Sequence, residues 1–423
     1  MERSPLRFAL VFALALSSAA AAWFLSPSSR ASAPLEQSAY VFQRDWSPAV
    51  RAAVSDHAHS FSSFSVLAAE ISFHDNAFQV IHVDYDAATL AHCGIPIGFV
   101  LRIGIIPRNP PDAERLVTQT ASQVIDRARR AGIEPAELQI DYDCPDSRLA
   151  ELTHWISNIR QSVSVPITLL ALPSWMNTAQ FVPLVRSADS FVMQVHALHK
   201  PNSPDDAVVL CDPEEARADI ERACRAGVPF RVALPTYTYL AAWDTNAKLL
   251  GLSAEGPMPA WPDAARFTSL SAEPRQMAQL VAELTADHPA NLRGIFWYRL
   301  PTSEDQFNWR WSCLQSVMSG IAPAANCRIG LHPVESGLTE ILLPNNGNAD
   351  APLPPTVFIA WPDGANLIAA DSLAGFDHVE IPLTRHVVFH PLESEFHSLA
   401  PGDRRVIGWI RLSQDCTLQT SLQ

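Results

Sequence analysis

Two aspartates, Asp141 and Asp143, end a short run of residues, QIDYD, whose composition predicts a β-strand. Side chains alternate between the two faces of a strand, so these aspartates share one face with Gln139. Two carboxyl groups held this close disfavour double ionisation. One can therefore keep a proton and act as a general acid while the other stays anionic. That division of labour suits cleavage of a glycosidic bond.

A structural explanation of the same aspartates is the alternative. The next helix is predicted to begin near Ser147, and Asp143 or Asp146 would serve as its N-cap. Asp146 and Ser147 already satisfy that need, so we favour catalysis or ligand binding for the pair formed by Asp141 and Asp143.

Glu70 and Arg102 are charged residues within predicted strands. Glu70 lies late in a strand expected at 64–73, and Arg102 lies in the middle of the next one, expected at 97–106. If both side chains face inward, the two residues pair across adjacent strands. Such a pair is equally compatible with a structural ion pair and with a contact to a substrate.

Several later residues are candidates for ligand binding. They are Gln194 and His196 on one face of a strand, Trp297 and Arg299 on one face of another, and Trp175 in a loop. Aromatic rings pack well against the apolar faces of pyranose rings. The alternatives are a satisfied core histidine for His196 and ordinary loop packing for the tryptophans.

Eight apolar segments with the composition of strands alternate with helical segments, which predicts an α/β protein with a (β/α)8 TIM barrel. The predicted strands are residues 39–43, 64–73, 97–106, 137–143, 166–172, 191–198, 229–237 and 293–300. Barrels of this kind carry their chemistry at the carboxyl ends of the strands. The candidates above are therefore expected to converge on one mouth.

Two further patterns receive structural explanations. Residues 78–86, FQVIHVDYD, follow an HDNA turn and predict a hairpin that extends the second barrel strand. We favour an exposed hairpin with acidic edge residues over a second catalytic pair there. His57 and His59 invite a metal site, but the polarity of the chain places them at the end opposite the mouth. No metal and no cofactor is expected.

The second half of the predicted barrel resembles the family-18 chitinase-like glycoside hydrolases strand by strand. In that family strand four ends in a D-x-D-x-E pattern, strand seven in a G-L-P-x-Y-G-like pattern, and strand eight in an apolar run closed by tryptophan. QIDYD, ALPTY and IFW occupy those places in this sequence. The resemblance implies a glycoside hydrolase fold and a carbohydrate ligand.

By that resemblance Asp143 stands where the family has its proton-donating glutamate, and Asp141 where it has its assisting aspartate. Gln139 replaces the outer aspartate. The implied substrate contacts are His196, at or next to the strand-six tyrosine, Tyr237, which matches the strand-seven tyrosine, and Trp297, which matches the sugar-stacking tryptophan. Aspartate is one methylene shorter than glutamate, which moves the proton of Asp143 away from a glycosidic oxygen. The family's use of a substrate N-acetyl group therefore does not carry over.

A closer resemblance, over most of the chain, is to an uncharacterised bacterial family of predicted barrel proteins, domain of unknown function 3142. The segments that carry it are QIDYDCP, LCDP, LSAEGP and NWRW. Together, the residues and the resemblances predict a glycoside hydrolase that acts on an extracytoplasmic polysaccharide or glycoconjugate. The alternatives are a catalytically inactive glycan-binding barrel and a cell-envelope scaffold protein.

The chain is expected to divide into four segments. They are a signal peptide or N-terminal membrane anchor at 1–25, a linker at 26–37, the glycoside-hydrolase-like barrel at 38–320, and an Ig-like β-sandwich at 323–423. Arg3 and Arg7 precede an apolar run and an A-x-A site near Ala22, as in export signals. The protein is therefore expected in the bacterial periplasm or secreted, with anchoring in the inner membrane as the alternative.

Charge and cysteine content limit the partners and the compartment. A formal charge of −14 over 423 residues argues against nucleic acid as a partner. With two lysines in the chain, Schiff-base chemistry has almost no candidates. Seven cysteines in an exported chain permit disulfides, and the expected pairs are Cys144 with Cys211 and Cys327 with Cys416.

Overall fold

The computed structural model describes residues 29–107, 112–196, 201–206, 209–253, 261–262, 264–392 and 398–422. The predicted signal peptide or anchor at 1–25 lies outside these residues. None of the helices that the structure describes is long and apolar enough to cross a membrane.

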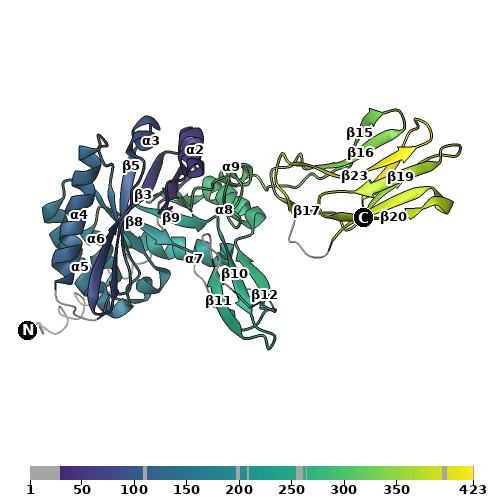
Figure 1. Ribbon diagram of the computed structural model, residues 1–423. Helices are drawn as coiled ribbons and strands as arrows, with labels where there is room; N and C mark the ends of the chain where they lie inside the picture. Colours follow the sequence, from purple (N-terminus) through teal and green to yellow (C-terminus); the bar gives the residue numbers. More distant parts are fainter. Residues whose placement is uncertain are drawn as a thin grey trace, which may run out of the picture.

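Eight parallel strands form a closed barrel (Figure 1). The strands are β2 (Glu36–Val41), β3 (Ser63–His74), β5 (Ile97–Ile103), β6 (Leu138–Tyr142), β7 (Ile167–Ala171), β8 (Ser190–Gln194), β9 (Phe230–Pro235) and β14 (Leu292–Tyr298). β2 pairs with β14 on one side and with β3 on the other, which closes the sheet. All eight predicted strands are present, and the predicted TIM barrel is confirmed.

Helices pack around the outside of the barrel. They are α2 (Pro48–His57), α3 (Ala87–His92), α4 (Ala113–Arg130), α5 (Leu149–Ser162), α6 (Phe181–Ser187), α7 (Pro213–Ala223), α8 (Pro274–Ala286) and α9 (Trp311–Met318). α4 shows the usual reason for this packing: Val117, Ala121, Val124 and Ala128 are three or four residues apart and form one buried apolar face.

Short elements complete the barrel domain. β1 (Arg30–Ala31) pairs antiparallel with β13 (His288–Pro289). The 3-10 helices are η1 (Ala58–Ser60), η2 (Asp146–Arg148), η3 (Pro173–Asn177) and η4 (Cys224–Ala226), and η5 (Pro382–Thr384) follows in the C-terminal part.

Two β-structures extend the barrel on the side where its strands end. β4 (Ala77–His82) pairs antiparallel with β3, and Asp75 and Asn76 form the turn with φ angles of 51° and 59°. This is the predicted hairpin. Between β9 and α8 the chain inserts a three-stranded sheet made of β10 (Thr238–Trp243), β11 (Leu249–Ser253) and β12 (Arg266–Ser271). The sequence did not predict this sheet.

The C-terminal part consists of two four-stranded antiparallel sheets. One contains β15 (Gly330–Glu335), β16 (Leu338–Pro344), β23 (Arg404–Leu412) and β19 (Leu367–Ser372); the other contains β20 (Phe376–Ile381), β21 (His386–Pro391), β18 (Val357–Ala360) and β24 (Gln419–Leu422). A small ladder joins β17 (Ala351–Pro352) to β22 (Ser398–Leu399). Ile341 and Ile410 of the first sheet share one buried core with Ile359 and Phe389 of the second. The predicted β-sandwich is confirmed, whereas its boundaries and Ig-like character stay predictions.

All seven cysteines are free thiols, so the predicted disulfides are wrong. Cys144 and Cys211 are buried, and the thiol of Cys211 donates to the carbonyl oxygen of Val195, 3.5 Å away. Burial raises the pKa of both thiols to about 12. These cysteines therefore pack as small apolar side chains.

Candidate active site

The strand register places three charged residues side by side at the barrel mouth. Glu70 on β3 is the neighbour of Arg102 on β5, and Arg102 is the neighbour of Asp141 on β6. The distance from Arg102 Nη1 to Glu70 Oε1 is 3.9 Å, and the distance from Arg102 Nε to Asp141 Oδ2 is 3.8 Å. The expected pairing of Glu70 with Arg102 is present and extends to Asp141.

The two aspartates differ in exposure. Asp141 is 8 % exposed, and burial together with the negative charge of Asp143 raises its pKa to about 7, against the opposing effect of Arg102. Asp143 directly follows β6 and is exposed at the rim. Protein atoms around its carboxyl group still raise its pKa through desolvation, and Arg102 again opposes. The pair therefore holds a proton near neutral pH.

The capping alternative for these aspartates is not supported. The N-cap residues are Pro145 for η2 and Arg148 for α5, and in the described chain neither helix is capped by a side-chain hydrogen bond. The expectation that Asp146 and Ser147 cap this helix is therefore wrong. The carboxyl group of Asp143 has no capping role to explain its position.

Three rings line the mouth beside the aspartates. His196 is 5 % exposed, and its Nδ1 shares a hydrogen bond with the Tyr237 hydroxyl, 3.3 Å away. The Tyr298 ring lies 5.8 Å from the His196 ring and 5.6 Å from the Tyr237 ring. Burial lowers the pKa of His196 to about 4, so this imidazole is neutral at physiological pH. The group offers hydrogen bonds and ring faces but no positive charge.

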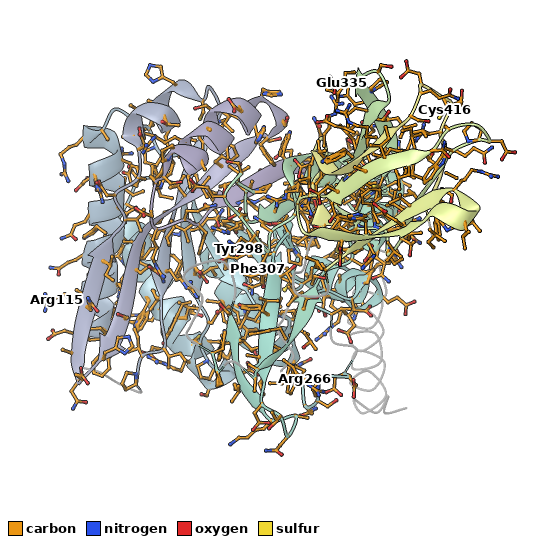
Figure 2. The ribbon with its side chains drawn as sticks, turned by 45° about the vertical axis from the view of Figure 1, so that its right-hand side comes forward. Arg115, Arg266, Tyr298, Phe307, Glu335 and Cys416 are labelled. Carbon is orange, nitrogen blue, oxygen red and sulfur yellow. The ribbon has the colours of Figure 1, made fainter. Side chains whose placement is uncertain are left out.

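Tyr298 connects the barrel to the inserted sheet. Figure 2 labels it near the middle of the molecule, and its ring packs against a cluster that includes Trp243 of β10 and Leu270 of β12. Gln194, the last residue of β8 and two residues before His196, is partly buried. The structure thus brings together His196, Tyr237 and Tyr298, of which the sequence indicated all but Tyr298.

Gln139 lies deeper in the barrel than the aspartates. It is fully buried, and its Nε2 donates to Ser65 Oγ at 2.8 Å and to Glu137 Oε1 at 2.7 Å. Its Oε1 accepts from the Tyr40 hydroxyl at 2.8 Å. These internal hydrogen bonds give Gln139 a place in the barrel core, below the mouth.

Trp297 lies on the face of β14 opposite to the mouth, and Arg299 directly follows the end of the strand. Trp297 is fully buried, and its Nε1 donates to Gln37 Oε1 at 2.7 Å. Arg299 Nη2 donates to Asp305 Oδ1 at 2.6 Å. Because side chains alternate along a strand, it is Tyr298 that points into the barrel. The position assigned to Trp297 by resemblance is therefore displaced by one residue.

Trp175 supports the mouth from behind. It belongs to η3, is fully buried, and donates its indole N–H to the carbonyl oxygen of Cys144 at 3.1 Å. It therefore holds the loop that follows Asp143, and its ring does not reach the mouth.

His57, of the pair formed with His59, has a structural explanation as well. The His57 ring stacks on Trp311 with 3.8 Å between ring centres. No group of three or more histidine, cysteine, aspartate or glutamate side chains in the described chain is arranged to hold a metal ion.

Comparisons with known proteins concern mainly the barrel. Similar solved structures include a chitinase from Chromobacterium violaceum (14% identity, TM-score 0.48, 68% of this chain and 98% of that chain). They also include the spore cortex-lytic enzyme SleL of Bacillus cereus (8%, 0.47, 69% and 75%). A third is the GH18 chitinase ChiB of Flavobacterium johnsoniae (13%, 0.42, 68% and 94%).

No curated protein matches the sequence. Residues 331–413, in the β-sandwich, match a family described as domain of unknown function DUF8456. Residues 94–303 cover the barrel from just before β5 to just after β14, including both aspartates of β6. These residues match the model of the family described as domain of unknown function DUF3142.

Proposed function

We propose that this protein is a glycoside hydrolase that acts on an extracytoplasmic polysaccharide or glycoconjugate. The observation that carries the proposal is the pair Asp141 and Asp143 at the carboxyl end of β6, both with raised pKa values. A carboxyl group that keeps its proton near neutral pH can protonate a glycosidic oxygen.

The difference in exposure supports different roles for the two aspartates. Asp143 is exposed at the mouth and is the carboxyl group that a bound glycan can reach. Asp141 lies one strand period deeper, holds the shared proton in the free protein, and passes it to Asp143 when the glycan binds. After the glycosidic bond breaks, the proton of Asp143 stays with the leaving hydroxyl group. A water molecule then adds its hydroxyl group to the anomeric carbon of the remaining sugar, and its other proton returns to the pair.

The neighbouring rings would hold the sugar. Tyr237 and Tyr298 keep their hydroxyl protons, because burial raises their pKa values well above the usual range. Neutral His196 adds a further hydrogen-bonding group. Such rings can stack on pyranose faces and bind hydroxyl groups together.

The test is release of reducing ends from a broad panel of glycans by the full-length protein, Asp143→Asn and Asp141→Asn. We expect turnover by the parent, a loss of about 100-fold or more for Asp143→Asn, and a comparable loss for Asp141→Asn. Asp126→Asn, at an exposed position on α4, is the control and should retain parental activity. No turnover of any glycan, with no measurable effect of Asp143→Asn, would contradict the proposal.

One observation favours a second candidate, a catalytically silent glycan-binding barrel. Position 143 carries aspartate where the chitinase-like family has glutamate, so the proton-bearing oxygen lies further from a bound glycosidic bond. Glycan binding that survives Asp143→Asn, in a parent protein without turnover, would favour this candidate.

The location and the partners belong to the same proposal. Residues 1–25 would direct the protein out of the cytoplasm, with or without anchoring in the inner membrane. Fractionation of cells expressing the full chain tests this, and a cytoplasmic fraction would contradict it. In the scaffold alternative, deletion of residues 323–423 would abolish the binding of a protein partner and leave glycan binding unchanged.

A further inference from the structure

Arg102 lies in a row of alternating charges that crosses four neighbouring positions of the mouth. Arg44, which follows β2, donates two hydrogen bonds to Glu70 on β3. Arg102 on β5 comes next, and Asp141 on β6 follows it in register. The order of charges is positive, negative, positive, negative.

Among the described residues, Arg102 interacts with its neighbours through charge, without a fixed hydrogen bond. Its nearest carboxyl oxygens, on Glu70 and Asp141, lie at 3.9 and 3.8 Å, beyond ordinary hydrogen-bond distance. Its side chain is 42% exposed, whereas the side chains of Glu70 and Asp141 are 12% and 11% exposed. The guanidinium group therefore lies over buried carboxyl groups, where charge is weakly screened.

Among the described residues, the main ionisable groups around the aspartate pair can each be assigned a charge. The groups are Tyr40 of β2, Arg44, Glu70 of β3, Arg102 of β5, His196 after β8, Tyr237 after β9, and Tyr298 of β14. The tyrosines stay protonated and His196 stays neutral near pH 7. Within the described mouth, this leaves Arg102 as the cation beside Asp141, because Arg44 is engaged by Glu70.

We propose that Arg102 is a positioning residue that keeps the Asp141 and Asp143 pair at one proton through neutral pH. Without this cation, three carboxyl groups would repel one another in a partly desolvated site. The pair would then take up a second proton at higher pH. A doubly protonated pair has no anionic partner left. The consequence for catalysis rests on the proposed function, but the number of protons on the pair does not.

The test is a titration of the aspartate carboxyl groups by carbon-13 NMR in the full-length protein. Asp141→Asn and Asp143→Asn assign the signals of the pair. In Arg102→Gln we expect the titration of the pair to move to higher pH by about one unit or more. Arg102→Lys should titrate close to the parent, because the positive charge is kept.

Arg44→Gln is the matched control. It removes one positive charge from the same mouth, but from a residue that contacts Glu70 and has no ion pair with Asp141. Its shift should be less than half of that in Arg102→Gln. An unchanged titration in Arg102→Gln, or equal shifts in the two variants, would overturn the inference.

Two further measurements keep the result interpretable. If Arg102→Gln fails to fold by circular dichroism, Arg102→Met removes the same charge and retains the packing of the aliphatic stem. Where a glycan is cleaved, the acidic limb of the pH profile should move to higher pH in the same variant, since activity needs an ionised partner. The NMR shift without any hydrolysis would support the role of Arg102 and reject the proposed function.

Discussion

Because Asp141 is buried, its negative charge lowers the free energy of unfolding of the protein. Carboxyl groups of unfolded chains titrate near pH 4, whereas burial raises the pKa of Asp141 to about 7. The folded state therefore binds this proton more tightly than the unfolded state does. The contribution to stability is complete below about pH 4 and is lost as the pH rises towards 7.

Asp141→Asn tests whether the ionised Asp141 carboxyl group lowers the stability of the folded protein. The amide has nearly the shape of the protonated carboxyl group and never ionises, so the variant should exceed the parent in free energy of unfolding by about 1–3 kcal/mol at pH 8. Near pH 4 the two proteins should be equal. Urea unfolding at both pH values measures the difference, with the exposed Asp126→Asn as control. A variant that is less stable than the parent at pH 8 contradicts the prediction.

Trp297 and Tyr298 are neighbours in sequence with different roles. Trp297→Ala should lower the free energy of unfolding by about 3–5 kcal/mol, because it removes a fully buried ring and leaves a cavity. Tyr298→Phe keeps the ring and should fold like the parent, while weakening glycan binding through loss of one hydroxyl group. Thermal melting and glycan affinity of both variants separate the two effects. A Trp297→Ala variant that melts at the same temperature as the parent would refute the burial argument.

The sequence could not decide which of these rings faces the mouth. In GIFWYRL, apolar or aromatic residues occupy both faces of the strand, since a barrel strand is buried on both sides. Alternation predicts that Phe296 and Tyr298 share a face, but hydrophobicity does not tell which face lies inside. The aspartates were easier to place, because two carboxyl groups on one face of a buried strand favour the mouth.

The barrel strands were predictable as elements because each is a short apolar run followed by a helix. The inserted sheet escaped prediction for a physical reason. β10 and β11 form a local hairpin across residues 244–248. The third strand, β12, pairs with β10 from beyond β11 and residues 254–260, and such a non-local partner leaves no periodic signal in the sequence. The hairpin of β3 and β4 was predictable because its partners are joined by a short turn with a clear signature.

Gly294 lies where β14 pairs with β2 and closes the barrel. A Cβ atom at this position would lie 2.6 Å from the carbonyl oxygen of Glu36. Gly294→Ala should therefore force the two strands apart and lower the free energy of unfolding by about 1–3 kcal/mol. Gly330→Ala is the control, because its Cβ atom would come no closer than 3.4 Å to any neighbour. Chemical denaturation compares the variants, and equal stabilities would contradict the expected clash.

At the scale of the whole molecule, two cores are joined through α9. The Ser312 hydroxyl donates to the carbonyl oxygen of Asn348 at 3.3 Å, and Asn348 Nδ2 donates to Ser316 Oγ at 2.6 Å. Asn348 Oδ1 also accepts from the backbone N–H of Ala324. The loop after β16 is therefore fastened both to the barrel's last helix and to the connecting segment.

Asn348→Ala removes the side-chain part of this junction. We expect faster cleavage between the two cores in limited proteolysis, by about 3-fold or more, because each lost hydrogen bond contributes about 1 kcal/mol. Barrel activity should stay at the parental level. Asn346→Ala is the control, since Asn346 contributes its backbone N–H to Asn326. Identical cleavage of Asn348→Ala and the parent would show that the junction does not depend on this side chain.

The absence of cross-links between the seven cysteines determines how far the chain can be extended when it is pulled from its ends. All seven cysteines lie in the described residues and none is cross-linked, so no covalent loop shortens the path between the ends. Stretched from its termini, a chain of 423 residues would extend to about 1,400 Å, at roughly 3.3 Å per residue. Both cores can thus be unravelled completely, and the protein can be threaded through a narrow pore without reduction of any bond.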